Sequence, residues 1–197
     1  MPSTSVSSQK SSASLGSQQD PDAGIVDAVR RGDHREALRL CARHHGRSVG
    51  RLCMALLGSA SEADDALQDT LLSAHASFST FRGDGSLRAW LFSIARRRCA
   101  RVLERRATEP RLERRAAAGD ATESHELADG LVDARRRAET ARALLARVRP
   151  TEREALLLRY EAGLSYREVG EACGVDEATA RKRVSRALAR LREFVKE

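Results

Sequence analysis

The sequence has no apolar run long enough to cross a membrane, which needs about 20 consecutive apolar residues. It also lacks the short apolar segment that follows a charged start in a secretory signal. We therefore expect a cytoplasmic protein without membrane insertion. The first twenty residues contain eight serines and almost no apolar side chains, so they bury too little surface to offset the entropy of ordering. This composition predicts a disordered serine-rich leader over residues 1–24.

Signals of catalysis and of metal binding are also missing. There is no phosphate-binding glycine loop, no cluster of metal ligands and no Ser/His/Asp set in a supporting context. The local group Cys41, His44, His45 and Cys53 has a spacing that matches no standard zinc pattern. We expect a protein that is not an enzyme, binds no cofactor and holds no metal. Its cysteines, at positions 41, 53, 99 and 173, form no C-x-x-C pair and should be reduced and buried.

The net charge of +7 is unevenly distributed. Residues 25–106 carry 15 basic and 9 acidic side chains, and residues 135–197 carry 16 and 10, a net +6 in each block. Residues 107–134 carry 3 basic and 7 acidic side chains, a net −4. Two basic blocks around an acidic connector suggest a polyanion partner, most often nucleic acid. Charge alone fits two solvated helical surfaces equally well.

β-branched runs are absent, and nearly every segment outside the leader and the connector has the three- and four-residue apolar spacing of a helix. The sequence predicts an all-α fold of two small helical domains, at residues 25–106 and 137–197. After Pro110 the periodicity fades through Ala-, Gly- and acid-rich sequence, which predicts a flexible acidic linker over residues 107–136.

Short polar patterns mark the expected helix ends. Ser86 should cap a helix that runs to about Arg106, and an earlier helix should break or bend between Gly46 and Gly50. In a capping box, a hydroxyl side chain and a carboxylate three residues later bond each other's backbone amides. The sequence predicts such boxes at Ser61 with Asp64, Thr151 with Glu154, and Ser165 with Glu168.

The strongest local pattern covers residues 164–188 and predicts a helix-turn-helix. Val169 should face inward, Gly170 should let a second helix approach closely, Gly174 should form the turn and Val175 should fill the corner. The second helix has an apolar stripe that includes Val184, Ala187, Leu188, Leu191 and Val195. Its outward face carries Arg181, Lys182, Ser185 and Arg186, and could enter a major groove. The alternative is an ordinary helical hairpin with a basic solvated face.

A second pattern lies in the first domain. Asp65, Gln68, Asp69 and Leu72 fall along one helix face, and this acidic stripe on a basic protein suits docking to a basic protein partner. The following segment places two phenylalanines and a polar turn before a helix that has an apolar stripe and an arginine-rich face. Such a turn could hold an extruded base while the arginines bind phosphates.

These patterns resemble those of the extracytoplasmic-function (ECF) group of bacterial RNA polymerase sigma factors. The resemblance rests on "ADDALQDTLL", "FRGDGSLRAWLFSIARRR" and "LSYREVGEACGVDEATARKRVSRALARLRE", in that order across the acidic connector. It implies that the first domain is sigma region two and the second is sigma region four. It also implies three partners: core RNA polymerase, promoter DNA and an anti-sigma protein.

The resemblance assigns three sets of residues. Docking on the clamp helices of the polymerase maps to Asp64, Asp65, Gln68, Asp69 and Leu72. Recognition of the promoter minus-ten element maps to Phe81, Arg82, Gly83, Asp84, Ser86, Arg96, Arg97 and Arg101. Recognition of the minus-thirty-five element maps to Arg159, Tyr166, Arg167, Thr179, Arg181, Lys182, Ser185 and Arg186.

The alternative function is a free-standing helix-turn-helix transcriptional regulator. Such a protein would not need the acidic helix or the segment around Trp90, so co-purification with core polymerase separates the two.

Overall fold

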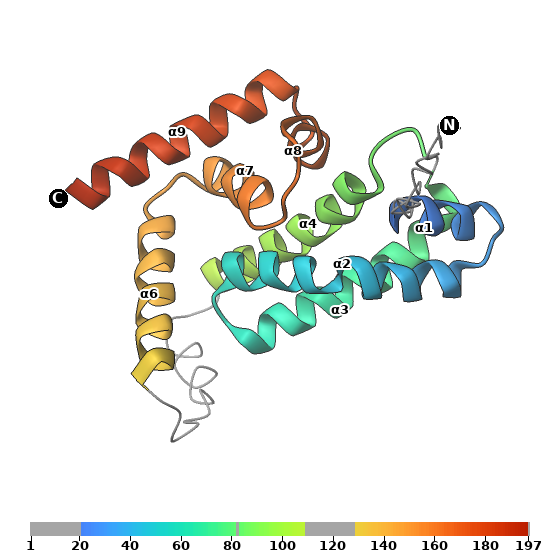
Figure 1. Ribbon diagram of the computed structural model, residues 1–197, viewed down its shortest axis with the longest axis horizontal. Coiled ribbons are helices and arrows are strands. Elements are labelled where there is room, and N and C mark those ends of the chain that lie inside the picture. Colours follow the sequence, from blue (N-terminus) through green and yellow to red (C-terminus); the bar gives the residue numbers. More distant parts are fainter. Residues whose placement is uncertain (1–20, 82, 109–128, 197) are drawn as a thin grey trace, which may run out of the picture.

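A computed structural model describes residues 21–81, 83–108 and 129–196. Within these ranges the chain is helical and contains no strand, which confirms the all-α fold class. The helices are α1 (Pro21–Arg30), α2 (His34–Leu57), α3 (Ala60–Ser77), the short 3-10 helix η1 (Phe78–Thr80), α4 (Leu87–Thr108), α6 (Asp129–Ala146), α7 (Pro150–Tyr160), α8 (Tyr166–Cys173) and α9 (Glu177–Lys196). Figure 1 shows α1 to α4 grouped together, with α7 and α8 beside α4.

Helix α2 is the centre of the first group of helices. It packs against α1, α3 and α4, and it buries Val49, Leu52 and Cys53 completely. Leu91 and Phe92 of α4 are also fully buried. Of the predicted break or bend between Gly46 and Gly50, the break is wrong, because α2 runs as one helix through both glycines. Glycine costs a helix only about 0.5–1 kcal/mol relative to alanine, and packing along the whole length of α2 outweighs that cost.

Two of the predicted helix caps are wrong and two are confirmed. The cap of α3 is Ser59, whose hydroxyl accepts from the Glu62 backbone amide, and not Ser61. Helix α7 begins at Pro150 without a side-chain cap, so Thr151 and Glu154 form no capping box; a proline at the first position needs no amide partner. Ser86 does cap α4, and the box of Ser165 with Glu168 is present at α8.

The second group of helices contains the predicted helix-turn-helix. Gly174 ends α8 in the left-handed conformation at φ 67°, and Val169 and Val184 are buried between α8 and α9. A Cβ placed on Gly170 would lie 2.7 Å from the backbone carbonyl oxygen of Val175, so only glycine fits there without a shift. The side chain of Val195, expected in the buried stripe of α9, lies outside the described part of the structure.

Two helices begin earlier than the predicted domain boundaries. Helix α1 starts at Pro21, inside the segment predicted as a leader, and α6 starts at Asp129, inside the segment predicted as a linker. Residues 1–20 and 109–128, on which the rest of both predictions falls, lie outside the described residues.

The thiols of Cys41, Cys53 and Cys99 are buried, and Cys173 is half-buried. Burial, with Asp22 nearby, raises the pKa of Cys41 to about 12. In the described ranges no group of three or more His, Cys, Asp or Glu side chains is arranged to hold a metal ion. No helix in these ranges is long and apolar enough to span a membrane.

We predict that Gly170→Ala destabilises the helix-turn-helix by about 1–3 kcal/mol, because the new methyl group would clash with a backbone oxygen that cannot move without opening the turn. Urea unfolding followed by circular dichroism measures this change. The matched control is Gly46→Ala in α2, where an added Cβ meets nothing within 4 Å and should stabilise by about 0.5–1 kcal/mol. Equal stability of the Gly170 variant and the wild type would contradict the close approach.

Candidate nucleic-acid and protein interfaces

Helix α3 separates a buried face of small residues from an exposed acidic face. Ala63, Ala66, Thr70 and Ala74 are buried against the neighbouring helices at helical spacing, and the Thr70 hydroxyl donates to the Ala66 carbonyl at 2.6 Å. On the opposite side the structure brings together every predicted docking residue in an exposed position: Asp64, Asp65, Gln68, Asp69 and Leu72. Leu72 is 65% exposed and lies on the same face as these polar side chains.

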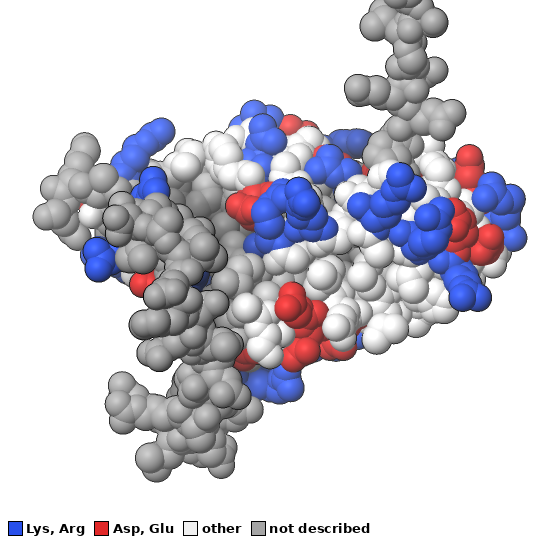
Figure 2. Space-filling view, turned by 60° about the horizontal axis from the view of Figure 1, so that its bottom comes forward, with Lys and Arg blue, Asp and Glu red and all other residues white. Residues whose placement is uncertain are grey.

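A groove of about 510 Å³ runs between α3 and α4. Asp65 and Asp69 line one wall, and Arg98, Arg101 and Arg105 line the other. The sequence resemblance assigned Arg101 to DNA, but in the structure it borders the acidic face of α3. Figure 2 shows a group of acidic side chains amid uncharged surface, with most of the Lys and Arg side chains on that face gathered away from it. Separate patches of opposite charge are typical of a molecule with more than one charged partner.

An aromatic cluster supports the turn before α4. Phe78 is buried with its ring centroid 5.8 Å from that of Trp90, and Phe81 is half-buried at 4.9 Å from Trp90. Gly83 takes a φ of 76°, which reverses the chain, and Asp84 is exposed. Phe81 therefore fixes the turn by packing on Trp90. Arg82, which was predicted as a minus-ten contact, lies outside the described residues.

The arginines of α4 differ in how far their charge is compensated. Arg96 donates to Glu154 of α7 at 3.1 Å and is largely covered. Arg97 is exposed, and its pKa is lowered first by burial of part of the side chain and then by the positive charges of Arg96 and Arg101. A guanidinium between like charges still stays protonated, so this part of α4 favours an anionic partner.

The first turns of α9 carry the basic face that the sequence predicted. Asp176 caps the helix by accepting from the Thr179 amide at 2.7 Å and from the Thr179 hydroxyl at 2.8 Å, so this hydroxyl belongs to the cap. Arg181 pairs with Glu177 at 2.7 Å, and its guanidinium carbon lies 4.5 Å from the Tyr166 ring centroid. The other predicted residues of this face are exposed: Lys182, Ser185 and Arg186.

Arg159 and Arg167, which were predicted together as DNA contacts, have different surroundings. Arg159 is half-buried, donates to the Leu164 carbonyl at 2.9 Å and lies 5.0 Å from the Tyr166 ring centroid. It therefore holds the turn between α7 and α8. Arg167 is 72% exposed and makes a long ion pair with Glu171 at 3.8 Å.

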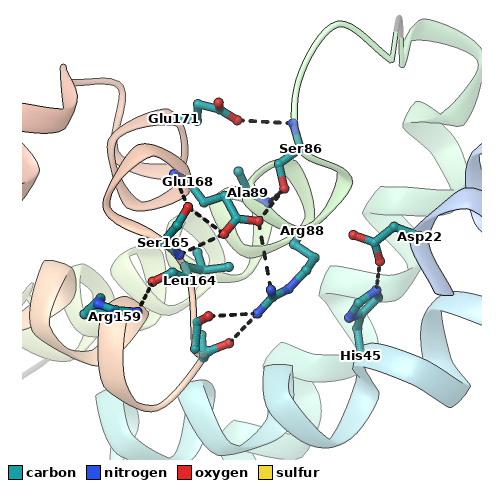
Figure 3. A network of polar contacts seen from close by, with 12 residues as sticks. Asp22, His45, Ser86, Arg88, Ala89, Arg159, Leu164, Ser165, Glu168 and Glu171 are labelled. Carbon is teal, nitrogen blue, oxygen red and sulfur yellow. Dashed lines mark hydrogen bonds and ion pairs between the residues drawn. The ribbon is translucent and has the colours of Figure 1, made fainter. Parts of the chain in front are cut away.

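The sequence analysis missed a set of contacts between the two groups of helices, shown in part in Figure 3. The Ser86 hydroxyl donates to Glu168 at 2.7 Å, and Arg88 donates to the carbonyls of Ala162 and Gly163 at 2.9 and 3.2 Å. Arg51 of α2 donates to Glu161 at 2.7 Å. No local sequence pattern predicts these pairs, because the two residues of each pair lie 74 to 110 positions apart in the sequence.

Comparison with known families assigns both groups of helices. The family described as Sigma-70 region 2 matches residues 41–109, and the family described as Sigma-70, region 4 matches residues 138–191. A helical protein that combines these two regions in this order belongs to the class of RNA polymerase sigma factors.

Similar proteins narrow the class. The ECF RNA polymerase sigma factor SigM of Mycobacterium tuberculosis is 31% identical over 89% of this chain and 85% of its own length. The ECF RNA polymerase sigma factor EcfG of Rhodopseudomonas palustris is 33% identical over 73% of this chain and 77% of its own length. The chain therefore belongs to the ECF sigma factors: it is an alternative sigma factor that binds core RNA polymerase and directs promoter-specific transcription initiation.

Solved structures agree on the fold. CnrH, solved in complex with the cytosolic domain of CnrY, superimposes with a TM-score of 0.69 at 21% identity, covering 90% of this chain and 98% of its own. The sigma factor RpoE of Bartonella quintana, solved with the anti-sigma factor NepR, gives a TM-score of 0.58 at 25% identity, covering 83% and 97%.

We predict that Arg159→Ala destabilises the second group of helices by about 1–3 kcal/mol, because it leaves the buried Leu164 carbonyl without its donor. Arg167→Ala should change stability by less than about 0.5 kcal/mol, since its long, exposed ion pair contributes little. Urea unfolding of both variants compares them directly. If the two substitutions cost the same, Arg159 does not hold the turn.

Proposed function

We propose that this sigma factor is a binding subunit without catalytic activity of its own, which acts in the cytoplasm where polymerase and chromosome meet. In this proposal residues 25–106 form region two, residues 137–197 form region four, and the acidic residues 107–136 join them behind a leader at 1–24. One observation carries the proposal: a single chain presents an exposed acidic helix face with an exposed leucine and, separately, the basic face of a helix-turn-helix.

The docking surface on core polymerase would be the exposed face of α3, formed by Asp64, Asp65, Gln68, Asp69 and Leu72. Three carboxylates steer a basic partner and set the register of docking. Leu72 would supply the apolar anchor, because a large exposed side chain gains most when a partner covers it.

The minus-ten element would meet the turn before α4 and the basic side of that helix. Phe81 and Trp90 support the turn at which Gly83 and Asp84 could receive an extruded base. Arg82, next to Gly83 in the sequence, is proposed as a further contact. The residues proposed to face the DNA strand along α4 are Ser86, Arg96, Arg97 and Arg101. Of these, Arg97 and Arg101 are exposed, and the pKa of Arg97 is lowered first by burial of part of the side chain and then by the charges of Arg96 and Arg101.

The minus-thirty-five element would meet the N-terminal half of α9, the part of a recognition helix that reaches base edges. Arg181, Lys182, Ser185 and Arg186 form its exposed face, and Tyr166 with Arg167 borders it from α8. Thr179 belongs to the cap of α9, and Arg159 belongs to the turn between α7 and α8. We propose that both contribute to DNA binding by positioning α9 on the DNA backbone.

We also propose an anti-sigma protein as a regulatory partner. The support is the similarity to RpoE, which was solved in complex with the anti-sigma factor NepR.

The docking proposal predicts that Asp65→Lys combined with Asp69→Lys weakens binding to core polymerase by about tenfold or more, because two attractions become repulsions. Both side chains are exposed, so the fold should be retained. A pull-down with purified core enzyme, or its titration by fluorescence anisotropy, measures the loss. Asp27→Lys with Glu193→Lys is the matched control, since both residues are exposed, lie away from α3 and give the same change in net charge. Equal loss in the two double variants would attribute the effect to net charge and overturn the docking surface.

The recognition-helix proposal predicts that Arg181→Ala relaxes sequence preference at one or two positions of the minus-thirty-five element, by about 1–3 kcal/mol of discrimination. Transcription by the reconstituted holoenzyme on a panel of promoter variants measures this preference. Arg192→Ala, exposed and further along α9, is the control and should leave the preference unchanged. A uniform loss on every promoter variant would instead assign Arg181 to a phosphate contact.

A further inference from the structure

Two carboxylates stand in succession at the start of α9, and the structure gives them different roles. Asp176 caps the helix by accepting from the Thr179 amide at 2.7 Å and from the Thr179 hydroxyl at 2.8 Å, and these hydrogen bonds lower its pKa. The carboxylate of Glu177 instead accepts from the guanidinium of Arg181, one turn further along the helix, at 2.7 Å. A carboxylate next to DNA repels phosphates. Glu177 therefore needs a role other than attraction of the DNA.

A second helix restricts the same guanidinium. The Arg181 guanidinium carbon lies 4.5 Å from the ring centroid of Tyr166, the first residue of α8, which is within the range of a cation–π contact. Tyr166 is half-buried, and its ring centroid also lies 5.0 Å from the guanidinium carbon of Arg159. Arg159 donates to the Leu164 carbonyl at 2.9 Å, as Figure 3 shows. A chain of contacts thus connects the turn between α7 and α8 to the exposed basic face of α9.

The other cations on this face are less restricted. Lys182 and Arg186 are exposed, and within the described ranges neither makes an ion pair or a ring contact. A side chain that can move is able to follow a phosphate wherever the shape of the DNA places it. Bidentate recognition of a base edge, in contrast, requires a guanidinium of fixed orientation. The contacts of Arg181 suit base reading, and those of its neighbours suit phosphate binding.

We propose that Glu177 and Tyr166 are positioning residues, which hold Arg181 in the orientation that reads a guanine of the minus-thirty-five element. Glu177 thereby determines specificity without touching the DNA. This inference rests on the proposed role of Arg181 as a base-reading residue. A guanidinium has five N–H donors, so the single hydrogen bond to Glu177 leaves enough of them for the O6 and N7 acceptors of guanine.

The pair acts on binding rather than on the stability of the fold. Its side chains are 59% exposed for Arg181 and 48% exposed for Glu177, and such exposed pairs contribute little to stability. Ordering a long side chain before the DNA arrives removes an entropic cost of binding that corresponds to about two- to tenfold in affinity. Only the matching base gains this advantage, because a restricted guanidinium cannot turn toward a phosphate when the base is wrong.

The test measures how strongly the reconstituted holoenzyme prefers its minus-thirty-five element, by transcription from a panel of promoter variants. Glu177→Ala should lower this preference about two- to tenfold at the positions where Arg181→Ala lowers it. Glu193→Ala is the matched control, because it removes an exposed carboxylate from the far end of α9 and should leave the preference unchanged. Wild-type preference in the Glu177→Ala variant would overturn the positioning role.

The salt dependence of promoter binding by the same holoenzymes separates positioning from a loss of structure. In Glu177→Ala the released Arg181 can bind a phosphate, and a negative charge near the DNA is removed. Promoters with a scrambled minus-thirty-five element should therefore be bound more tightly than by the wild type. The slope of log affinity against log salt should steepen by about one. Weaker binding to every promoter would indicate a merely structural role and overturn the proposal.

Two pairs of variants test the contacts themselves. Glu177→Gln retains an oxygen that can accept from Arg181, and it should keep more of the preference than Glu177→Ala. Tyr166→Phe retains the ring, and it should keep more of the preference than Tyr166→Leu. Circular dichroism verifies the helix content of each variant. Equal losses within either pair would show that the contact concerned does not position Arg181.

The inference and the proposed function fail separately. Glu177→Ala combined with Arg181→Ala should lose no more preference than Arg181→Ala alone, because Glu177 acts through Arg181. A further loss at another base pair would make Glu177 a direct reader and overturn its positioning role. A uniform loss on all promoter variants by Arg181→Ala alone would instead remove base reading from Arg181, whatever Glu177→Ala does.

Discussion

The hydrogen bond from Ser86 to Glu168 joins two helix beginnings. The Ser86 hydroxyl accepts from the Ala89 amide and so caps α4, while it donates to Glu168. Glu168 in turn accepts from the amide and the hydroxyl of Ser165 and closes the capping box of α8. Each helix would begin at the same residue without the other, because each cap is complete locally. The shared carboxylate adds something else: it fixes the start of the helix-turn-helix against the start of the helix that follows the aromatic turn.

The arginines of α2 and α4 that lie between the two groups of helices are paired with carboxylates. Arg51 of α2 and Arg96 of α4 pair with carboxylates of the second group of helices, whereas the acidic face of α3 is exposed. The exposed pair of Arg51 with Glu161 contributes little to stability, whereas the pair of Arg96 with Glu154 is largely covered. Each group of helices has its own buried apolar side chains, among them Leu52 and Phe92 in the first group and Val169 and Val184 in the second.

The sequence alone determined most of the local structure and the family. Helical periodicity, the caps at Ser86 and Ser165, the turn at Gly174 and the acidic face of α3 all depend on residues within one or two helical turns of each other. Prediction from the sequence failed where neighbouring residues could equally well form the same feature, such as a helix cap. Ser59 and Ser61 both offer a hydroxyl near the start of α3, and the helix begins at Ala60 with Ser59 as its cap. Gly46 and Gly50 predict a break only when α2 is considered without the helices that hold it.

Only the tertiary structure decided which charged residues meet. Arg51 and Glu161, or Arg96 and Glu154, carry no signal in their own segments, because an exposed arginine on a helix looks the same whether it faces water, DNA or another helix. The same holds for Arg159, whose role in the turn before α8 depends on the carbonyl of Leu164 pointing toward it. Periodicity determines which face of a helix is buried within its own domain. The partner of the exposed face depends on how the domains pack, and that is a property of the whole chain.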